Sequence, residues 1–172
     1  CNDVDYNSFY GRAGDRVYAA VMTSFNARAI FDSELTIFAS DGTTVIELDN
    51  DDGSLGSTSS SIAGATLPAS GTYYARVRYN ASATSTIHPY YLYLTVQTGS
   101  PSPEVESNND FPGQALADSG WVTGVISAVA DADFYSLTLQ AGESVFVSLD
   151  LDPERDGATW NAHTGLGAFG TP

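Results

Sequence analysis

The sequence predicts an all-β protein made of tandem antiparallel, jelly-roll-like β-sandwich domains, the second of which is incomplete. Three observations lead to this prediction. Apolar residues alternate with period two over short segments, turn residues separate those segments, and one stretch recurs 128 positions later in the chain. Period-two alternation is typical of half-buried strands, whereas a helix would repeat about every 3.6 residues.

The internal repeat places DVDYNSFYGRAGDRVYAAV (3–21) over DADFYSLTLQAGESVFVSL (131–149). Both copies have Asp-x-Asp, an aromatic residue, a turn of Ala, Gly and an acid, and then alternating apolar positions. These positions share one face of an expected strand: Val17, Ala19 and Val21 in the first copy, and Val145, Val147 and Leu149 in the second. Each copy is therefore expected to form a pair of strands.

Further strands are expected between the two copies. Residues 33–48 read as a hairpin around the Asp41-Gly42 turn, with Leu35 and Ile37 facing the core. Residues 69–79 and 90–96 alternate strongly as well. Short strands at this spacing, with turn residues between them, favour an antiparallel sandwich.

The segment 98–106 has two prolines and no periodicity, which is typical of a linker. We therefore expect a first sandwich over 1–97, a linker over 98–103 and the N-terminal part of a second sandwich over 104–172. The first unit lacks a counterpart of 104–130, and the second lacks a counterpart of 73–96. Either the chain is a piece of a longer protein, or another chain supplies the missing strands.

Composition excludes several classes of partner. The 172 residues include six Lys plus Arg, all of them Arg, and 21 Asp plus Glu, for a net charge of -15. The resulting field repels nucleic acids and anionic lipid surfaces and attracts cations. Cys1 is the one cysteine, so no internal disulfide can form. No segment has the roughly 18 apolar residues of a membrane span, and the Ser-, Thr- and Gly-rich composition favours a secreted or cell-surface protein.

The order of the motifs resembles the bacterial pre-peptidase C-terminal domain family, which includes the collagen-binding modules of clostridial collagenases. The second unit carries EVESNND, DADFY and AGE. The first carries DVDY, AGD, SELTIFASDGTTV, LDNDDG, LPASGTYYARV and YYLYLTV. The resemblance implies a jelly-roll-like sandwich without catalytic activity, appended to a secreted enzyme and, in some members, bound to calcium.

The acidic segment EVESNND is the candidate metal site. Calcium takes about six to eight oxygen ligands from carboxylates, amides, carbonyls and water. The family pattern implies a ligand segment completed by aspartates at the start of a strand, with Asp favoured where this chain has Asn109. Carried onto this sequence, the candidates are Glu104, Glu106, Asn108 and Asn109, with Asp131 and Asp133 as completing ligands. Asp110 is a further candidate, because its carboxylate would restore the charge that Asn109 lacks. The alternative is a solvated linker whose Asn and Asp residues initiate turns.

Two other acidic clusters, LDNDDG (48–53) and DLDPERDG (150–157), are expected to be exposed turns, because neither fits the EF-hand loop. Catalytic patterns are missing from the sequence. His88 and His163 lie in different units without a nearby nucleophile or acid pattern, and no Gly-rich phosphate loop or serine-hydrolase motif occurs. We therefore expect that the protein is not an enzyme.

A ligand surface is expected where tyrosines face away from the core. Alternation in 73–79 and 90–96 leaves Tyr74, Tyr91 and Tyr93 on an outward face beside Arg76 and Arg78. Tyr and Arg are enriched in binding hot spots, and the resemblance implies ligand contacts for such tyrosines. The alternative is that they only pair across strands and stabilise the sheet.

Two functions remain open from sequence. The first is a non-catalytic, calcium-stabilised binding or accessory module of a larger extracellular protein, with a protein or polymer as ligand. The second is a structural subunit of an extracellular filament, in which neighbouring chains complete one another by strand addition.

Overall fold

The computed structural model describes residues 3–23, 32–51, 58–80, 87, 89–151, 162 and 164–167. The secondary structure of these residues is strand, turn and irregular chain, so the predicted all-β class is confirmed. Among them there is no helix of the length and apolarity that a membrane crossing needs.

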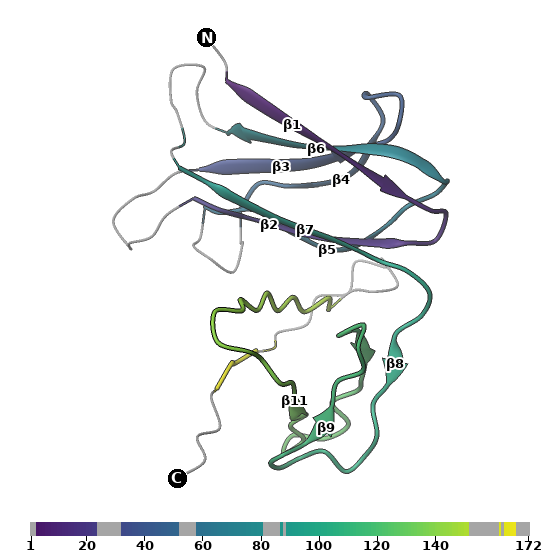
Figure 1. Cartoon of the computed structure of the whole chain (residues 1–172), viewed down its shortest axis with the longest axis vertical. Helices are drawn as coiled ribbons and strands as arrows, with labels where there is room; N and C mark the ends of the chain where they lie inside the picture. The colour runs from purple at the N-terminus through teal and green to yellow at the C-terminus, as the bar shows by residue number, and fades with distance from the viewer. Residues whose placement is uncertain are drawn as a thin grey trace.

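Two antiparallel sheets form the sandwich in the first part of the chain (Figure 1). The four-stranded sheet has the order β1 (Val4–Gly11), β6 (Gly71–Tyr79), β3 (Ser33–Phe38) and β4 (Val45–Asp49). The three-stranded sheet has the order β5 (Ser61–Thr66), β2 (Arg16–Met22) and β7 (Tyr91–Gln97). Apart from the β3–β4 neighbours, which follow one another in the sequence, the paired strands come from distant parts of the chain, so both sheets are held mainly by long-range pairing.

The core lies between the two sheets. Val17, Ala19 and Val21 of β2 are buried against Leu35 and Ile37 of β3, as the alternation predicted. The other members of the cluster come from β5, β6 and the turn that precedes β6: Ile62, Ala65, Leu67, Tyr73, Ala75 and Val77. Burial of these apolar side chains is the main source of stability for this unit.

The expected hairpin of residues 33–48 is confirmed as β3 and β4. Its turn is fixed by Asp41, whose Oδ1 accepts hydrogen bonds from the backbone N–H groups of Thr43 and Thr44, both at 2.8 Å. A further hydrogen bond from the Thr44 hydroxyl, together with these two, lowers the pKa of the exposed Asp41 carboxyl to about 2. Such side-chain bonds to the following backbone are the reason that Asp favours turns.

An ion-pair network holds the outer face of the four-stranded sheet. Pairing places Glu34 of β3 opposite Arg78 of β6. The next pair on the same face of the sheet is Thr36 and Arg76. Glu34, which is 5 % exposed, binds Arg76 at 2.6 Å and Arg78 at 2.5 Å. Burial alone would raise the pKa of Glu34, but the hydrogen bonds and charges of the two arginines outweigh burial and lower it.

The rest of the chain has far less regular structure. Two parallel pairs form there: β8 (Ser102–Pro103) with β10 (Val122–Thr123), and β9 (Gln114–Ala115) with β11 (Tyr135–Ser136). We expected a pair of strands over 131–149, and this prediction is wrong beyond β11, because residues 137–149 form turns and irregular chain. Val147 and Leu149 are 47 % and 49 % exposed rather than buried on a strand. Within the described chain no strand pairs with 137–149, and alternation without a partner does not make a sheet.

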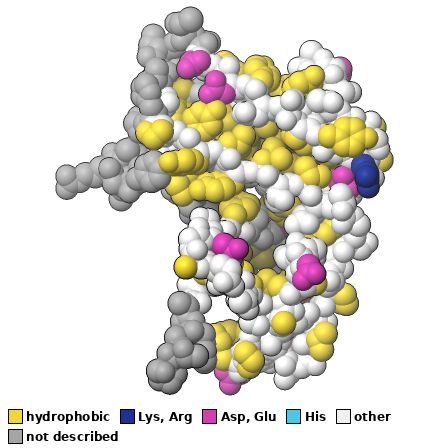
Figure 2. Space-filling model, viewed as in Figure 1, with side chains coloured by type: hydrophobic (Ala, Val, Ile, Leu, Met, Phe, Trp, Pro, Cys, Tyr) yellow, Lys and Arg dark blue, Asp and Glu magenta, His cyan; other side chains and the backbone are white. Residues whose placement is uncertain are grey.

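Residues 98–151 lie below the three-stranded sheet in Figure 1. The Tyr93 and Phe146 rings stack with centroids 6.0 Å apart, and Trp121 meets Tyr18 edge-on at 6.5 Å. The Gln97 side-chain amide donates to the Ser119 carbonyl at 3.1 Å. Figure 2 shows apolar side chains on the surface of both the sandwich and this lower region. A few aromatic and polar contacts therefore hold the lower region against the sheet.

Candidate metal centre

The loop of residues 104–108 is held at both ends by backbone hydrogen bonds. The Glu104 N–H donates to the Thr123 carbonyl at 2.9 Å, which continues the β8–β10 pairing by one residue. The Asn108 carbonyl accepts from the Phe134 N–H at 3.0 Å, just before β11. The acidic loop is thereby brought against Asp133, which lies 25 or more positions away in the sequence.

Three carboxylates converge at this point. Glu104, Glu106 and Asp133 each offer an oxygen, and these oxygens all lie within 4.8 Å of one another. Two oxygens bound to the same calcium ion can be at most about 4.6–5.2 Å apart, because each lies about 2.3–2.6 Å from the ion. The spacing of the three oxygens therefore fits one shared calcium ion.

The Asn108 side chain also contacts the cluster. It is 2 % exposed, and one of its terminal atoms lies 3.2 Å from Glu106 Oε2 and 3.3 Å from Asp133 Oδ1. If that atom is the amide nitrogen, it donates hydrogen bonds to both carboxylates. If it is the amide oxygen, three oxygens face one another, which is favourable when a cation lies between them. The same amide can therefore donate hydrogen bonds to the carboxylates in one orientation and offer its oxygen to a cation in the other.

The carboxylates of the cluster repel one another when all of them are ionised. Burial, followed by the charges of Glu104, Asp131 and Glu106, raises the pKa of Asp133 to about 6. Burial and the charges of Asp133 and Glu104 raise the pKa of the Tyr135 hydroxyl to about 12. A divalent cation reverses this repulsion, because it favours the ionised form of every carboxylate around it.

Both carboxylate oxygens of Glu104 lie against other groups of the fold. Its Oε1 accepts the Val125 N–H at 2.6 Å, and its Oε2 lies 3.5 Å from the Tyr135 hydroxyl. A Cβ at Gly124 would lie 2.4 Å from Glu104 Oε2, closer than atoms can approach. Gly124 therefore leaves the space that this carboxylate occupies. Sequence analysis missed Gly124 and Tyr135, and only the position of Tyr135 just after the Asp-x-Asp pattern could have indicated a role.

The structure brings four of the seven metal candidates together and separates three. Asp131 Oδ2 accepts from the backbone N–H and the hydroxyl of Ser127 at 2.5 and 2.8 Å, so it stabilises a turn beside the cluster. Asn109 and Asp110 are exposed, and Asp110 Oδ1 accepts from the Phe111 N–H. The cluster itself, called the acidic cluster below, consists of Glu104, Glu106, Asn108 and Asp133.

The expected tyrosine surface is divided between two sheets. Tyr74 lies on β6, whereas Tyr91 and Tyr93 lie on β7, and Tyr93 stacks on Phe146. Two tyrosines of β1 join Tyr74 instead. Tyr6 and Tyr10 are 55 % and 64 % exposed, and pairing with β6 places them on the outward face of the four-stranded sheet. The alternation of Tyr6, Ser8 and Tyr10 in the sequence was the signal for this face.

The remaining sequence candidates lie mostly outside the described residues. This holds for His88, His163, nearly all of the cluster at 150–157 and the end of the cluster at 48–53. The described part of the latter ends at Asp51. There the Asp49 carboxylate accepts the Ser61 N–H at 2.6 Å and so links β4 to β5.

Comparison with known proteins adds a structural likeness. No family model matches the chain, and no curated protein matches its sequence. The crystal structure of Aeromonas hydrophila PliG, a periplasmic lysozyme inhibitor of g-type lysozyme, is similar over 56 % of this chain and 77 % of that one, with 23 % identity and a TM-score of 0.40. A likeness this weak does not extend to function.

Proposed function

We propose that this chain is a non-catalytic binding module of an extracellular protein, and that a calcium ion at the acidic cluster stabilises it. The observation that carries the proposal is the convergence of three carboxylate oxygens within 4.8 Å around the buried Asn108 amide. These residues supply four ligand groups, and water or the second carboxylate oxygens would complete the about six to eight that calcium takes.

Calcium would stabilise the region that has least regular structure. β8 to β11 are pairs of two residues each, and the loop of residues 104–108 joins the two pairs. An ion held by Glu104, Glu106 and Asp133 would link the segment before β9 to the segment before β11. Binding free energy then becomes folding free energy, because the site does not exist in the unfolded chain.

The ligand face of the module is proposed to be the outer surface of the four-stranded sheet. Tyr6, Tyr10 and Tyr74 present aromatic area there, and Arg76 and Arg78 are oriented by Glu34. The Arg76 guanidinium also lies 4.8 Å from the centroid of the Phe38 ring. Aromatic and arginine side chains held in fixed positions suit the recognition of a protein or polymer ligand.

Calcium titration tests the metal proposal. We expect excess calcium to raise the melting temperature of the wild-type chain by several degrees over a chelator-treated sample, as a binding energy of a few kcal/mol would. Asp133→Asn should weaken calcium binding, measured by calorimetry, at least about tenfold. In chelator the same variant should be as stable as the wild type or more so, because the repulsion of Asp133 by Glu104 and Glu106 is gone.

Asp118→Asn is the matched control, because Asp118 is an exposed acid of the same region outside the acidic cluster. It should bind calcium as the wild type does. A wild-type chain that gives no binding heat and no calcium-dependent change in melting temperature would refute the metal proposal.

A further inference from the structure

One glutamine binds the backbone on both sides of Glu104. Gln114, the first residue of β9, accepts a hydrogen bond from the Val105 N–H at its Oε1, at 2.7 Å. Its Nε2 donates to the Pro103 carbonyl at 3.2 Å. Pro103 and Val105 are the residues before and after Glu104. A side-chain amide suits this place, because it offers an acceptor and a donor at once.

The backbone of Gln114 is bound to the segment that carries Asp133. The Gln114 N–H donates to the Phe134 carbonyl at 2.8 Å, and the pairing of β9 with β11 begins at the same residue. Gln114 therefore contacts the acidic loop with its side chain and the residue after Asp133 with its backbone. The two segments that supply the three carboxylates are joined through this residue.

Gly113 permits the close approach of the two segments. A Cβ at Gly113 would lie 2.0 Å from the Phe134 carbonyl oxygen, closer than atoms can approach. Its φ of 70° also lies in the left-handed region that favours glycine. The backbone of residues 113–114 can therefore lie directly against Phe134, which leaves the Gln114 side chain within reach of residues 103–105.

The fixed backbone bears on both glutamates of the cluster, because Glu104 and Glu106 flank Val105. Their carboxylate oxygens lie within 4.8 Å of each other and of an Asp133 oxygen. Glu104 Oε1 also accepts the Val125 N–H at 2.6 Å. That hydrogen bond depends on where the Glu104 carboxylate lies, and so it reports the position of the ligand with or without a cation.

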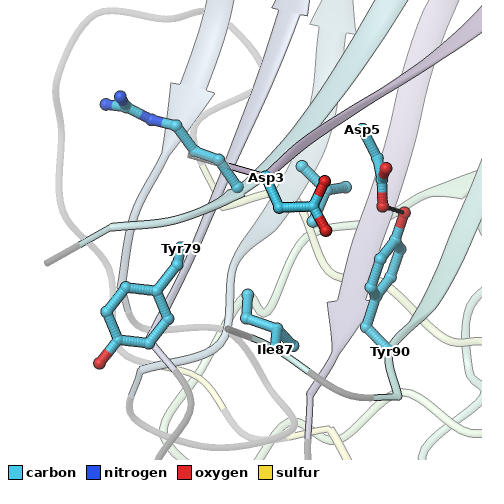
Figure 3. A pocket seen from close by; sticks show the side chains of 7 residues that line it. Asp3, Asp5, Tyr79, Ile87 and Tyr90 are labelled. Carbon is cyan, nitrogen blue, oxygen red and sulfur yellow. Dashed lines mark hydrogen bonds between the residues drawn. The ribbon is translucent and has the colours of Figure 1, made fainter. Parts of the chain in front are cut away.

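The first copy of the repeat shows that the Asp-x-Asp pattern does not form such a cluster by itself. At the offset of 128 residues, Asp3 and Asp5 correspond to Asp131 and Asp133. Asp5 Oδ2 accepts the Tyr90 hydroxyl at 2.7 Å, and both aspartates line a small pocket (Figure 3). Among the described residues, no group of three acids that could hold a metal ion includes Asp3 or Asp5. Other carboxylates must be brought to the pattern, as the loop of residues 104–108 brings them to Asp133.

We propose that Gln114 is the positioning residue of the acidic cluster, whose side-chain amide holds residues 103–105 so that Glu104 and Glu106 meet Asp133. This inference deepens the proposed function and rests on it. The backbone engages both polar atoms of the Gln114 side chain, so Gln114 acts through the ligands rather than as one of them. Holding the carboxylates together before the ion arrives raises the affinity, because less ordering remains for the ion to bring about.

Gln114→Met tests this proposal on the full chain, because methionine keeps the length of the side chain and removes both hydrogen bonds. We expect calcium binding, measured by calorimetry, to be at least about tenfold weaker. In chelator, we expect the Val125 N–H to exchange with solvent at least about tenfold faster, measured by NMR, because Glu104 no longer stays in place as its acceptor. The Leu116 N–H, which donates to Ser136 in the β9–β11 pair, is the internal reference and should keep its exchange rate.

Gln97→Met is the matched control. The Gln97 side-chain amide also donates to a backbone carbonyl of the same region, that of Ser119 at 3.1 Å, but it does not contact the acidic loop. This variant should leave calcium binding and Val125 exchange unchanged. Gln114→Asn is a second test variant, because it keeps the amide on a side chain too short to reach both backbone groups, and it should weaken calcium binding as well. Circular dichroism must show that the variants are folded.

The outcomes separate the positioning role from the calcium site. If the wild type and Gln114→Met bind calcium equally well, the positioning role is overturned and the calcium site stands. Faster exchange shared by Val125 and Leu116 would mean that Gln114 only stabilises the fold, and an unchanged Val125 rate would also overturn the role. A wild-type chain that binds no calcium, with faster exchange of Val125 alone in Gln114→Met, would support the positioning role and refute the proposed function.

Discussion

Residues 3–21 and 131–149 carry the same pattern, and one part of it folds alike in both. In the first copy the Arg12 N–H donates to Asp15 Oδ2 at 2.8 Å, and in the second the Gln140 N–H donates to Glu143 Oε2 at 2.7 Å. Gly14 and Gly142 have φ of 87° and 92° in these turns. The flanking segments differ, since β1 and β2 are full strands and 137–149 is irregular.

The difference shows that an alternating segment forms a strand only where neighbouring strands can pair with it. β1 pairs with β6, and β2 pairs with β5 and β7, so the alternating residues of the first copy have sheets on which to pack. The described chain offers 137–149 no such strand. A turn needs only its own few residues, whereas a strand needs neighbours.

The largest test of this comparison removes corresponding apolar side chains. Val21 is 1 % exposed and its counterpart Leu149 is 49 % exposed. We expect Val21→Ala to lower the free energy of unfolding by about 2 kcal/mol, through lost burial and a cavity. Leu149→Ala should change it by less than about 0.5 kcal/mol. Urea unfolding followed by circular dichroism measures both, and equal losses would show that the second copy is packed in solution.

A second test uses the pH dependence of stability. In the sandwich a buried carboxylate faces two arginines, whereas in the acidic cluster a carboxylate faces other carboxylates. Glu34 faces two arginines and has a lowered pKa, so it binds fewer protons in the folded chain than in the unfolded one. Its stabilisation is present above pH 4.5 and is lost as the pH falls below that value. Glu34→Gln should cost about 1–3 kcal/mol at pH 7 and less in acid.

The pKa of Asp133 is shifted in the opposite direction from that of Glu34. Its pKa is raised from 3.8 to about 6, so the folded chain binds the extra proton. In chelator, its unfavourable contribution is full above about pH 6 and disappears as the pH falls toward 3.8. Melting curves of the wild type, Glu34→Gln and Asp133→Asn between pH 7 and about pH 3 should therefore show Glu34→Gln below the wild type and Asp133→Asn at or above it at pH 7. The difference for Asp133→Asn should disappear as the pH falls from about 6 toward 3.8, and that for Glu34→Gln should shrink only below pH 4.5. Parallel curves would contradict the comparison.

The smallest test addresses the turn that both copies share. Gly14→Ala places a Cβ at positive φ, in a turn that also donates the Gly14 N–H to the Leu67 carbonyl of the sandwich. We expect a loss of about 1 kcal/mol in the free energy of unfolding. Gly142→Ala introduces the same strain in a turn without strands on both sides. It should leave the unfolding curve nearly unchanged, and a loss as large as that of Gly14→Ala would mean that both turns belong to one cooperative unit.

The acidic cluster was only partly predictable from sequence. Glu104, Glu106 and Asn108 were candidates because they offer oxygen ligands within one short segment, and Asp133 was a candidate because the family resemblance implies completing aspartates at the start of a strand. Asp131 instead accepts hydrogen bonds from Ser127, which the sequence pattern does not indicate. The tyrosine face was also incomplete, because Tyr6 and Tyr10 join Tyr74 only through the pairing of β1 with β6.

The sequence by itself determined the features that depend on neighbouring residues. These are the all-β class, the Asp41 turn, the two Ala-Gly-acid turns and the inward faces of β2, β3 and β6. The tertiary structure decided which alternating segments became strands and which acids share a site. Both depend on residues far apart in the sequence, because sheet pairing and metal ligation act between atoms that only the folded chain brings together.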